Sequence, residues 1–579
     1  MDTLKQNLIE LVGDALSEAS GIANSDPNVI TASKPEFGDY QSNGVMSVAK
    51  KVGTNPRQLA SDVVDKLSAN TNPLISKLEV AGPGFINIHL SDSALMSRAA
   101  LIKSEPEKLI PKTEKPEKIV IDYSSPNLAK EMHVGHLRGT IIGDCLARVL
   151  ERQGHEIIRQ NHVGDWGTQF GMLISYMREL SASEGDLPTQ LADLESFYRA
   201  AKERFDADAD FAYTARASVV KLQGGDDEHL RVWKQFIDES LKHCQAIYDK
   251  LNVTLGPEDL KAESFYNKDL EGVVEKLDKA SLLSVSDGAR CVFLPEFTGK
   301  DGDPLPVIIQ KTDGGYLYAT TDLAAVQYRS FDLQAKRSLY VVDARQSLHF
   351  QQVFAVARKA GFASEDISLE HIAYGTMMGE DGKPFKTRSG DTIKLVDLLD
   401  ESIRRAHELV SQKNPGLSAE AYNEIAEKVG IASVKYADLS KNRTSDYIFD
   451  WSSMLSFEGN TAPYLMYAYA RIKSILRKQD ADLEQMQITS IGDSAERSLL
   501  LKIMQLPEIV DMVARDCYPN SLCNYLYELA GLFMRFYESC PILKAEAELR
   551  DSRLALSALT ASTLQQGLDL LGISTLEQM

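Results

Sequence analysis

Residues 124–139 read Ser-Ser-Pro-Asn-Leu-Ala-Lys-Glu-Met-His-Val-Gly-His-Leu-Arg-Gly, and the predicted fold is built around this stretch. Just before it, residues 118–123 form a short apolar run rich in β-branched side chains, which indicates a buried strand. Just after it, residues 140–150 carry apolar side chains at helical spacing. The stretch therefore lies at a strand-to-helix junction, where backbone N–H groups and the helix dipole favour a bound anion.

Two histidines, His133 and His136, stand three residues apart on the first predicted helical turn and face the same way. Both can donate hydrogen bonds to phosphate oxygens, and Gly135 leaves room for a flat base against the backbone. Such a pair can also be structural, or it can bind zinc together with one or two further ligands. His155 and His162 are present, but no cysteine pair accompanies them. On these residues alone, nucleotide chemistry and the other two interpretations stay open.

The whole stretch resembles the His-Ile-Gly-His signature of class I aminoacyl-tRNA synthetases, in the Ser-Pro-Asn-x-Ala-Lys-x-x-His-x-Gly-His form of the arginyl-tRNA synthetases. The resemblance extends along nearly the whole chain. It implies ATP-dependent activation of L-arginine to arginyl-adenylate and transfer to the 3′-terminal ribose of tRNA(Arg), with release of AMP and pyrophosphate. The implied partners are ATP with Mg²⁺, L-arginine and tRNA(Arg), without a protein-bound metal.

Two other functions are compatible with parts of the sequence. Nucleotidylyltransferases share His-x-Gly-His and chemistry at the α-phosphate, but they are usually small and would leave the long helical second half unexplained. A non-catalytic tRNA-binding relic could keep the fold, but its motifs should have decayed. Here Lys130, both histidines and Gly135 are all present.

The composition is that of a soluble globular protein, with 44% hydrophobic and 25% charged residues. Its 579 residues leave room for about three or four domains. No apolar run reaches membrane-spanning length, and residues 1–7 lack a signal-peptide pattern. The six cysteines are scattered without Cys-x-x-Cys, which favours reduced thiols in a cytoplasm. We therefore predict a cytoplasmic protein without membrane contact, and we expect a monomer.

The net charge of −20 is unfavourable for a nucleic-acid partner, because phosphate binding requires lysine and arginine. Net charge does not describe local patches, and an acidic protein can bind tRNA through a basic face while avoiding bulk nucleic acid. The charge lowers the expectation of RNA binding without excluding it.

The predicted fold class is multidomain α/β plus α, because strands alternate with helices in the middle of the chain. We predict strands at 80–90, 156–160, 306–310, 316–322 and 338–343, the last four in a Rossmann-like parallel sheet. The predicted domains are an N-terminal α+β domain (1–110), an α/β domain (111–390) with a mostly helical insertion at about 175–300, a helical connecting region (391–455) and a final helical domain (456–579). The resemblance implies that the first contacts tRNA, the second is catalytic and the last binds the anticodon.

A polar loop after residue 378 carries three cations in six residues, Lys383, Lys386 and Arg388, which could clamp a triphosphate. A solvated charged hairpin would look similar. Class I synthetases have a Lys-Met-Ser-Lys-Ser loop at this place, whereas this chain has Phe-Lys-Thr-Arg-Ser at 385–389. The family's second lysine thus appears as Arg388, and many bacterial arginyl-tRNA synthetases pair this change with a lysine that Lys130 matches.

Recognition of arginine requires carboxylates, because its planar guanidinium offers five N–H donors for bidentate pairing. Glu263 and Asp322 match the family's acidic positions, although Glu263 could also be a solvated loop acid. Tyr318 would share a face with Asp322 if that segment were helical. Asn127 and Gln346, each at a strand end, are placed to hold the α-amino and carboxylate groups.

The resemblance assigns the remaining roles. The catalytic group is Lys130, His133, Gly135, His136, Lys383, Lys386 and Arg388, and ATP is bound by Pro126 and Asn127 together with Lys130, His133, Gly135 and His136. Contacts to tRNA are expected at Phe37 and Asn43 in the N-terminal domain and at Tyr467 and Arg471 in the last one. Aromatic and basic side chains there could stack on single-stranded RNA, but an aromatic core with a solvated basic face is an equally good interpretation.

Overall fold

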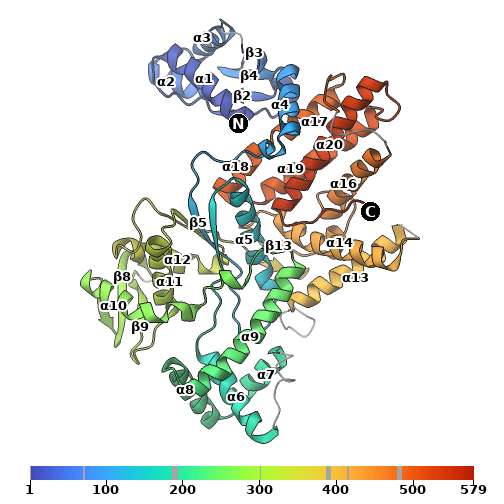
Figure 1. The fold of residues 1–579 in the computed structure, drawn as a ribbon. Coiled ribbons are helices and arrows are strands. Elements are labelled where there is room, and N and C mark those ends of the chain that lie inside the picture. The colour runs from blue at the N-terminus through green and yellow to red at the C-terminus, as the bar shows by residue number, and fades with distance from the viewer. Residues whose placement is uncertain are drawn as a thin grey trace.

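The computed structural model describes residues 2–69, 72–184, 194–299, 302–385, 393–413, 416–478 and 486–579. Figure 1 shows an N-terminal α+β domain, a central α/β part around one parallel sheet, and a C-terminal part made of long helices. The predicted fold class is therefore confirmed. The predicted domain limits stay a prediction.

The N-terminal domain packs helices on an antiparallel four-stranded sheet of order β1-β2-β4-β3. Its core is apolar and includes Leu8, Val12, Ile86 and Ile88. Its elements are α1 (Leu4–Ser20), β1 (Val29–Thr31), η1 (Pro35–Phe37), β2 (Tyr40–Ser42), α2 (Val45–Val52), α3 (Pro56–Ala69), β3 (Ile75–Ala81), β4 (Phe85–Leu90), α4 (Asp92–Ser104) and η2 (Pro106–Leu109).

The single strand predicted at 80–90 is wrong, because the chain reverses direction within it. Gly82 and Gly84 have φ values of 51° and 139°, which glycine adopts without a steric penalty. The turn they form joins β3 to β4 as an antiparallel hairpin.

The central sheet is parallel and has the order β11-β10-β5-β6. Its middle strand β5 is buried, as expected for a parallel strand covered on both faces. All four strands run the same way, so their carboxyl ends meet at one edge, where ligands of such sheets bind. The strands and the helix after β5 are β5 (Lys118–Asp122), α5 (Val134–Arg152), β6 (Glu156–Gln160), β10 (Arg337–Tyr340) and β11 (Ser368–His371).

Two strands predicted for this sheet are corrected by the structure. Residues 306–310 belong to β9 (Pro304–Gln310), which pairs with β8 (Ala289–Thr298) in a separate antiparallel sheet of order β7-β8-β9, with β7 at Leu283–Ser286. The connection between β8 and β9 is too short for the crossover that a parallel pair needs. Residues 318–322 begin the helix α11, whose Ala-rich sequence favours a helix over a strand.

The segment between β6 and β10 is mostly helical, with that small sheet inserted. Figure 1 shows α6 to α8 at the bottom of the molecule and α10 to α12 at the left. The elements between β6 and β10 are α6 (Thr168–Glu184), α7 (Leu194–Ala207), α8 (Ala209–Gln223), α9 (Asp227–Lys250), η4 (Pro257–Asp259), η5 (Glu263–Asp269), α10 (Leu270–Lys279), β7 (Leu283–Ser286), β8 (Ala289–Thr298), β9 (Pro304–Gln310), α11 (Tyr318–Gln327) and the π-helical η6 (Tyr328–Asp332). Between β10 and β11 lie η7 (Ala344–Gln346) and α12 (Ser347–Lys359).

The C-terminal part is helical, as predicted, apart from a short parallel pair of β12 (Met377–Met378) and β13 (Tyr447–Ile448). Its helices are α13 (Leu395–Lys413), α14 (Ala419–Leu439), α15 (Trp451–Met454), α16 (Ala462–Arg477), α17 (Ser494–Met504), α18 (Leu506–Asp516), α19 (Asn520–Ser539) and α20 (Ala547–Leu570). No helix in the described ranges is both long and apolar enough to cross a bilayer. All six cysteines are buried free thiols.

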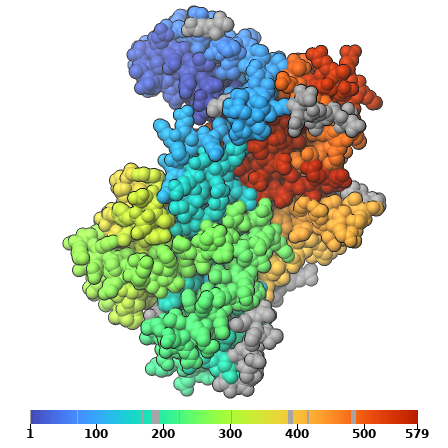
Figure 2. Space-filling model, in the orientation of Figure 1, coloured from blue at the N-terminus to red at the C-terminus, as the bar shows by residue number. Residues whose placement is uncertain are grey.

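The N-terminal domain is held against the C-terminal helices by polar contacts. Arg497 forms a bidentate pair with Asp39 at 2.7 and 2.8 Å and also bonds to Asp92. Nearby, the Tyr40 hydroxyl donates to Glu508 at 2.6 Å. In Figure 2 the blue N-terminal part and the orange-red C-terminal part accordingly touch in the upper half of the molecule.

Candidate functional site

The turn after β5 has an unusual backbone conformation. Ser124 and Ser125 have φ values of 69° and 44°, in the left-handed region that side chains other than glycine rarely adopt. The backbone N–H of Ser125 donates to Asn161 Oδ1 at 3.0 Å, and its hydroxyl donates to Asp122 Oδ1 at 2.9 Å. Strained residues that persist in this way are often part of a functional site. The predicted strand–turn–helix junction is present.

The two histidines cap the start of α5 reciprocally. The backbone N–H of Gly135 donates to His133 Nδ1 at 3.1 Å, and that of His133 donates to His136 Nδ1 at 3.0 Å. The ring centroids are 3.9 Å apart. Each Nδ1 accepts a hydrogen bond, so a neutral imidazole at either position carries its proton on Nε2. The pair thus offers two Nε2–H donors.

Both rings are neutral at physiological pH. Burial lowers the pKa of His136 to about 3, and the neighbouring His133 makes a smaller contribution in the same direction. Burial also lowers the pKa of His133, and the cations Lys130 and Arg345 add to that shift. Gly135 leaves room for the His133 ring in this position, because a Cβ there would lie 2.8 Å from Cε1 of that ring. The sequence alone does not show this contact.

The start of α5 is held in place by segments from far along the chain. Val134 N–H donates to the Ile393 carbonyl, and Arg138 forms a buried ion pair of 3.0 Å with Asp438 on α14. At Gly143 a side chain would overlap Tyr123, so glycine lets α5 lie directly on β5. The helix contacts β5 and β6 as well as α13, α14, α18 and α20. The histidine pair is therefore mounted where the sheet and the C-terminal helices meet.

Of the predicted cations, Lys130 is close to the histidine pair. Its Nζ lies 4.2 Å from the centroid of the Tyr198 ring on α7, a cation–π distance. Lys383 is exposed in a turn closed by Gly379 N–H donating to its carbonyl and by its own N–H donating to Asp381. Lys386 and Arg388 lie outside the described residues.

The acidic residue Asp322 lies on α11 and contacts two histidines. Its Oδ2 is 2.6 Å from Nε2 of His349 at the start of α12. Its Oδ1 is 3.9 Å from Nε2 of His162, which follows β6. Neither contact is predicted from the sequence; the only signal in it is the position of His349, three residues after Gln346.

The second predicted acid, Glu263, is partly buried at the start of η5. Its backbone N–H donates to the Val163 carbonyl at 3.1 Å. Burial raises the pKa of Glu263 to about 7; His162 opposes this shift, while Asp165 and Asp322 add to it. These features disfavour the interpretation as a solvated loop acid, and a cationic ligand would restore the charge of this carboxyl.

The remaining residues predicted to bind ATP or arginine lie at the same edge of the sheet. Asn127 pairs with Gly164, and its Oδ1 accepts from Gln169 at 2.7 Å. The carbonyl of the buried Pro126 accepts from Gly164 N–H at 3.1 Å. Tyr318 is 62% exposed and lies one helical turn before Asp322, so the condition that the segment be helical is met. Gln346 is exposed at the N-terminus of α12.

The predicted tRNA-binding residues lie elsewhere. Phe37 is half-buried with Lys34 Nζ 5.9 Å from its ring centroid, and Asn43 is half-buried after β2. On α16, Tyr467 is 41% exposed, and the Arg471 guanidinium lies 4.5 Å from the ring centroid of Tyr537. Arg471 thus already contacts an aromatic ring, while Tyr467 keeps an exposed face.

A zinc site at the histidine pair gains no support. His155 lies at the opposite end of β6, where its Nδ1 accepts from Glu117 N–H at 3.1 Å. In the part of the chain that the structure describes, no group of three or more His, Cys, Asp or Glu side chains could hold a metal ion.

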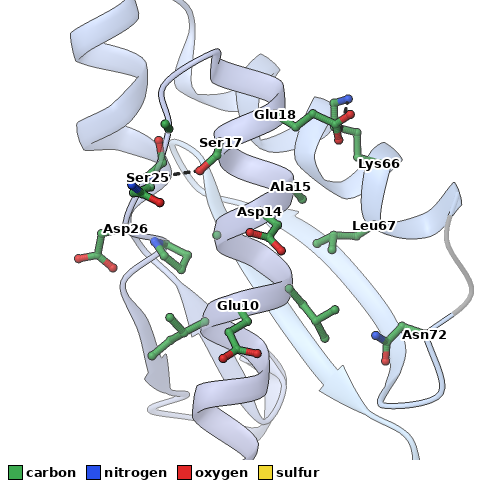
Figure 3. Close-up of a pocket in the computed structure, with 16 residues that line it drawn as sticks. Glu10, Asp14, Ala15, Ser17, Glu18, Ser25, Asp26, Lys66, Leu67 and Asn72 are labelled. Atoms are coloured by element: carbon green, nitrogen blue, oxygen red, sulfur yellow. Dashed lines mark hydrogen bonds and ion pairs between the residues drawn. The ribbon is translucent and has the colours of Figure 1, made fainter.

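A cavity of about 900 Å³ lies in the N-terminal domain, between α1, the loop that follows it and α3. Figure 3 shows the carboxylates of Glu10, Asp14, Glu18 and Asp26 around it, with Lys66 paired to Glu18 at 3.3 Å. This acidic lining would repel phosphate, so the cavity is not a second nucleotide site.

Comparison with known proteins agrees with this geometry. Three family models match in order: "Arginyl tRNA synthetase N terminal domain" over residues 6–90, "tRNA synthetases class I (R), catalytic domain" over 98–451 and "DALR anticodon binding domain" over 465–579. The chain is 55% identical over 578 residues to the arginine–tRNA ligase of Chromobacterium violaceum, covering 100% of both. It is also 55% identical over 582 residues to that of Cellvibrio japonicus, covering 100% of this chain and 99% of the relative.

Among solved structures, the arginyl-tRNA synthetase of Plasmodium falciparum is 29% identical and superposes with a TM-score of 0.84, covering 100% of each chain. The agreement therefore extends over all three parts of the molecule and includes the strand–turn–helix that carries His133 and His136. This chain belongs to the arginyl-tRNA synthetases, the class I family of arginine–tRNA ligases.

Proposed function

We propose that this arginine–tRNA ligase activates L-arginine with ATP and charges tRNA(Arg) at the carboxyl edge of its parallel sheet. One observation carries the location: the histidine pair and the two acids share that edge. Gly164 pairs with Asn127, which lies in the turn between β5 and the histidine pair. The backbone carbonyl of the neighbouring Val163 accepts a hydrogen bond from the Glu263 N–H. Phosphate donors and guanidinium acceptors thus lie around one short segment after β6.

In the first step, a carboxylate oxygen of arginine attacks the α-phosphorus of ATP, which enters with Mg²⁺ as its substrate complex. A new P–O bond forms to give arginyl-adenylate, and the bond to the β-phosphate breaks to release pyrophosphate. Negative charge increases on the α-phosphate as this happens. The Nε2–H donors of His133 and His136 and the ammonium of Lys130 would stabilise that charge, and they need little reorganisation because the capping bonds already orient the rings.

In the second step, a hydroxyl of the 3′-terminal ribose attacks the carbonyl carbon of the adenylate, and AMP leaves. We propose that the N-terminal domain contacts tRNA near Phe37 and Asn43, and that α16 contacts it through Tyr467 and Arg471. Exposed aromatic faces beside arginine support stacking on single-stranded bases. We further propose a cytoplasmic monomer, since one chain supplies every residue assigned to the site.

For arginine, we propose that Glu263 and Asp322 bind the guanidinium, Tyr318 packs against it, and Asn127 and Gln346 hold the α-amino and carboxylate groups. The raised pKa of Glu263 supports this role, because acids placed close together in a partly buried site favour a cation.

The proposal is tested by exchange of labelled pyrophosphate into ATP. We expect exchange that requires both arginine and tRNA(Arg), and none with lysine. The requirement for tRNA follows the family. RNA binding to the outer domains would shift α5, which contacts the C-terminal helices, into its active position. Exchange without any amino acid would indicate a nucleotidylyltransferase, and tRNA binding without exchange would indicate a relic.

The pH dependence of arginine binding should report Glu263. Below pH 7 this carboxyl is increasingly protonated and cannot pair with a guanidinium, so the KM for arginine should rise as pH falls. If only the ionised form binds, KM rises about tenfold between pH 8 and pH 6. Steady-state charging at saturating MgATP and tRNA measures this. Glu263→Gln should give a high KM that no longer varies with pH in this range, whereas a pH-independent KM in the parent enzyme would contradict the assignment.

Lys130 should contribute more to the rate of arginine activation than the lysines of the 379–391 loop. It is near enough to depress the pKa of His133, whereas Lys383 is exposed in a turn. We expect Lys130→Ala to slow activation about tenfold to a hundredfold, the range for one charged hydrogen bond. Lys383→Met and Lys386→Met should each do less. Single-turnover formation of arginyl-adenylate provides the comparison, and the reverse order of effects would refute compensation by Lys130.

A further inference from the structure

We propose that His349 is a positioning residue for amino-acid selection, which orients the Asp322 carboxylate so that its other oxygen meets the guanidinium of arginine. The inference rests on the proposed role of Asp322. It adds a residue from a different helix, α12, to the determinants of specificity.

The contact between these two side chains is short and sheltered. His349 Nε2 and Asp322 Oδ2 are 2.6 Å apart, and both side chains are 16% exposed. Asp322 Oδ1 is 3.9 Å from His162 Nε2, which exceeds hydrogen-bonding distance. The His349 contact therefore occupies one carboxylate oxygen and leaves the other for a ligand.

The His349 ring is itself fixed by aromatic neighbours on two helices. The Tyr318 ring packs edge-on with centroids 4.9 Å apart, and Phe350 lies at 5.3 Å. Tyr318 lies on α11, the same helix as Asp322, and Phe350 follows His349 on α12. The His349 ring therefore packs between a side chain of α11 and its own neighbour on α12. A ring held in this way gives the carboxylate one preferred orientation before substrate arrives, which reduces the ordering cost of binding.

An imidazole suits this position for an electrostatic reason. Lysine or arginine beside Asp322 would pair with the carboxylate permanently and compete with the guanidinium of the substrate. An imidazole can supply an N–H donor without carrying a permanent positive charge, so the acids Glu263, Asp165 and Asp322 can keep their attraction for a cation. The substrate then supplies the cation that this group of acids lacks.

The test replaces His349 with phenylalanine, which preserves the packing against Tyr318 and Phe350 but removes the donor. We expect the arginine KM of H349F to rise about tenfold. The kcat at saturating arginine and the KM for ATP should stay within about twofold of the parent values. H349Q, whose amide N–H can reach Asp322, should recover most of the arginine affinity. His243, which is paired with Glu239 on α9, offers a matched control in H243F with no expected change.

A double-mutant cycle with Asp322→Asn separates positioning from general damage. If His349 acts through Asp322, H349F should add little in the Asp322→Asn background. Additive effects, equal losses in kcat and ATP affinity, or no rescue by H349Q would overturn the inference. So would an unchanged arginine KM in H349F while Asp322→Asn raises it. If Asp322→Asn itself leaves the arginine KM unchanged, the proposed role of Asp322 in arginine binding is wrong. This result differs from those that reject only the role of His349.

Discussion

Replacing His133 or His136 with alanine should slow arginine activation by about a hundredfold to a thousandfold, the cost of removing one preorganised donor to a developing oxyanion. The expectation follows from the reciprocal cap at the start of α5, which makes each Nδ1 an acceptor and so leaves Nε2–H to donate. Because these donors act mainly on the charge that develops in the transition state, affinity for tRNA should be nearly unchanged.

The measurement is single-turnover formation of arginyl-adenylate in the presence of tRNA, together with tRNA binding by the same variants. His133→Ala also removes the N-cap of α5, which costs on the order of 1 kcal/mol of stability. His133→Asn restores a good N-cap and separates that loss from catalysis. His155→Ala, at the far end of β6, is the matched control. A variant of either motif histidine with normal adenylate formation would remove the assignment.

The pH profile of the histidines differs from that of the acids. The pKa of His136 is about 3, so this ring stays neutral as pH falls from 8 toward 6, and the pKa of His133 is also lowered from its usual value by burial. Glu263, whose pKa is about 7, becomes protonated in the same range. A fall in activity over this interval should therefore appear in the KM for arginine and not in the activation rate at saturating arginine.

The sequence predicts the strand–turn–helix that carries the two histidines, because the signal for it is local. The β-branched apolar run before the motif and the helical apolar spacing after it indicate the strand and the helix from neighbouring residues alone. Segments that depend on pairing partners are harder to predict. The segment 316–322 is too short for periodicity to distinguish a strand from a helix. Residues 306–310 do form a strand, but the sequence does not show which sheet that strand joins.

The contact between Asp322 and His349 could not be predicted from the sequence for a different reason. The two residues lie 27 positions apart on separate helices, and no local pattern relates them. Their distance depends on how α11 packs against α12. The same holds for the ion pair of Arg138 and Asp438, which are 300 positions apart and bring α5 against α14.

Asp322→Asn should raise the KM for arginine by roughly 30-fold to several thousandfold, which corresponds to about 2–5 kcal/mol for removing one partner of a buried charge pair. The geometry makes the substitution doubly unfavourable. His349 Nε2–H would hold the amide oxygen of the new side chain, as it holds Oδ2 now, and this would turn the NH₂ group toward the guanidinium. A donor would then face a donor in place of the present acceptor.

The KM for ATP should change little in this variant, because the described contacts of Asp322 are with His349 on α12 and with His162, and not with the histidine pair that we propose binds phosphate. Lysine should remain a very poor substrate, since its compact ammonium cannot span both acids and leaves part of the carboxylate array unpaired. Asp332→Asn, an exposed acid just after the same helix, is the matched control. Steady-state charging with arginine and with lysine measures these effects. A normal arginine KM in both Asp322→Asn and Glu263→Gln would contradict the assignment of these acids to arginine specificity. The chemistry assigned to His133 and His136 would not be affected by that result.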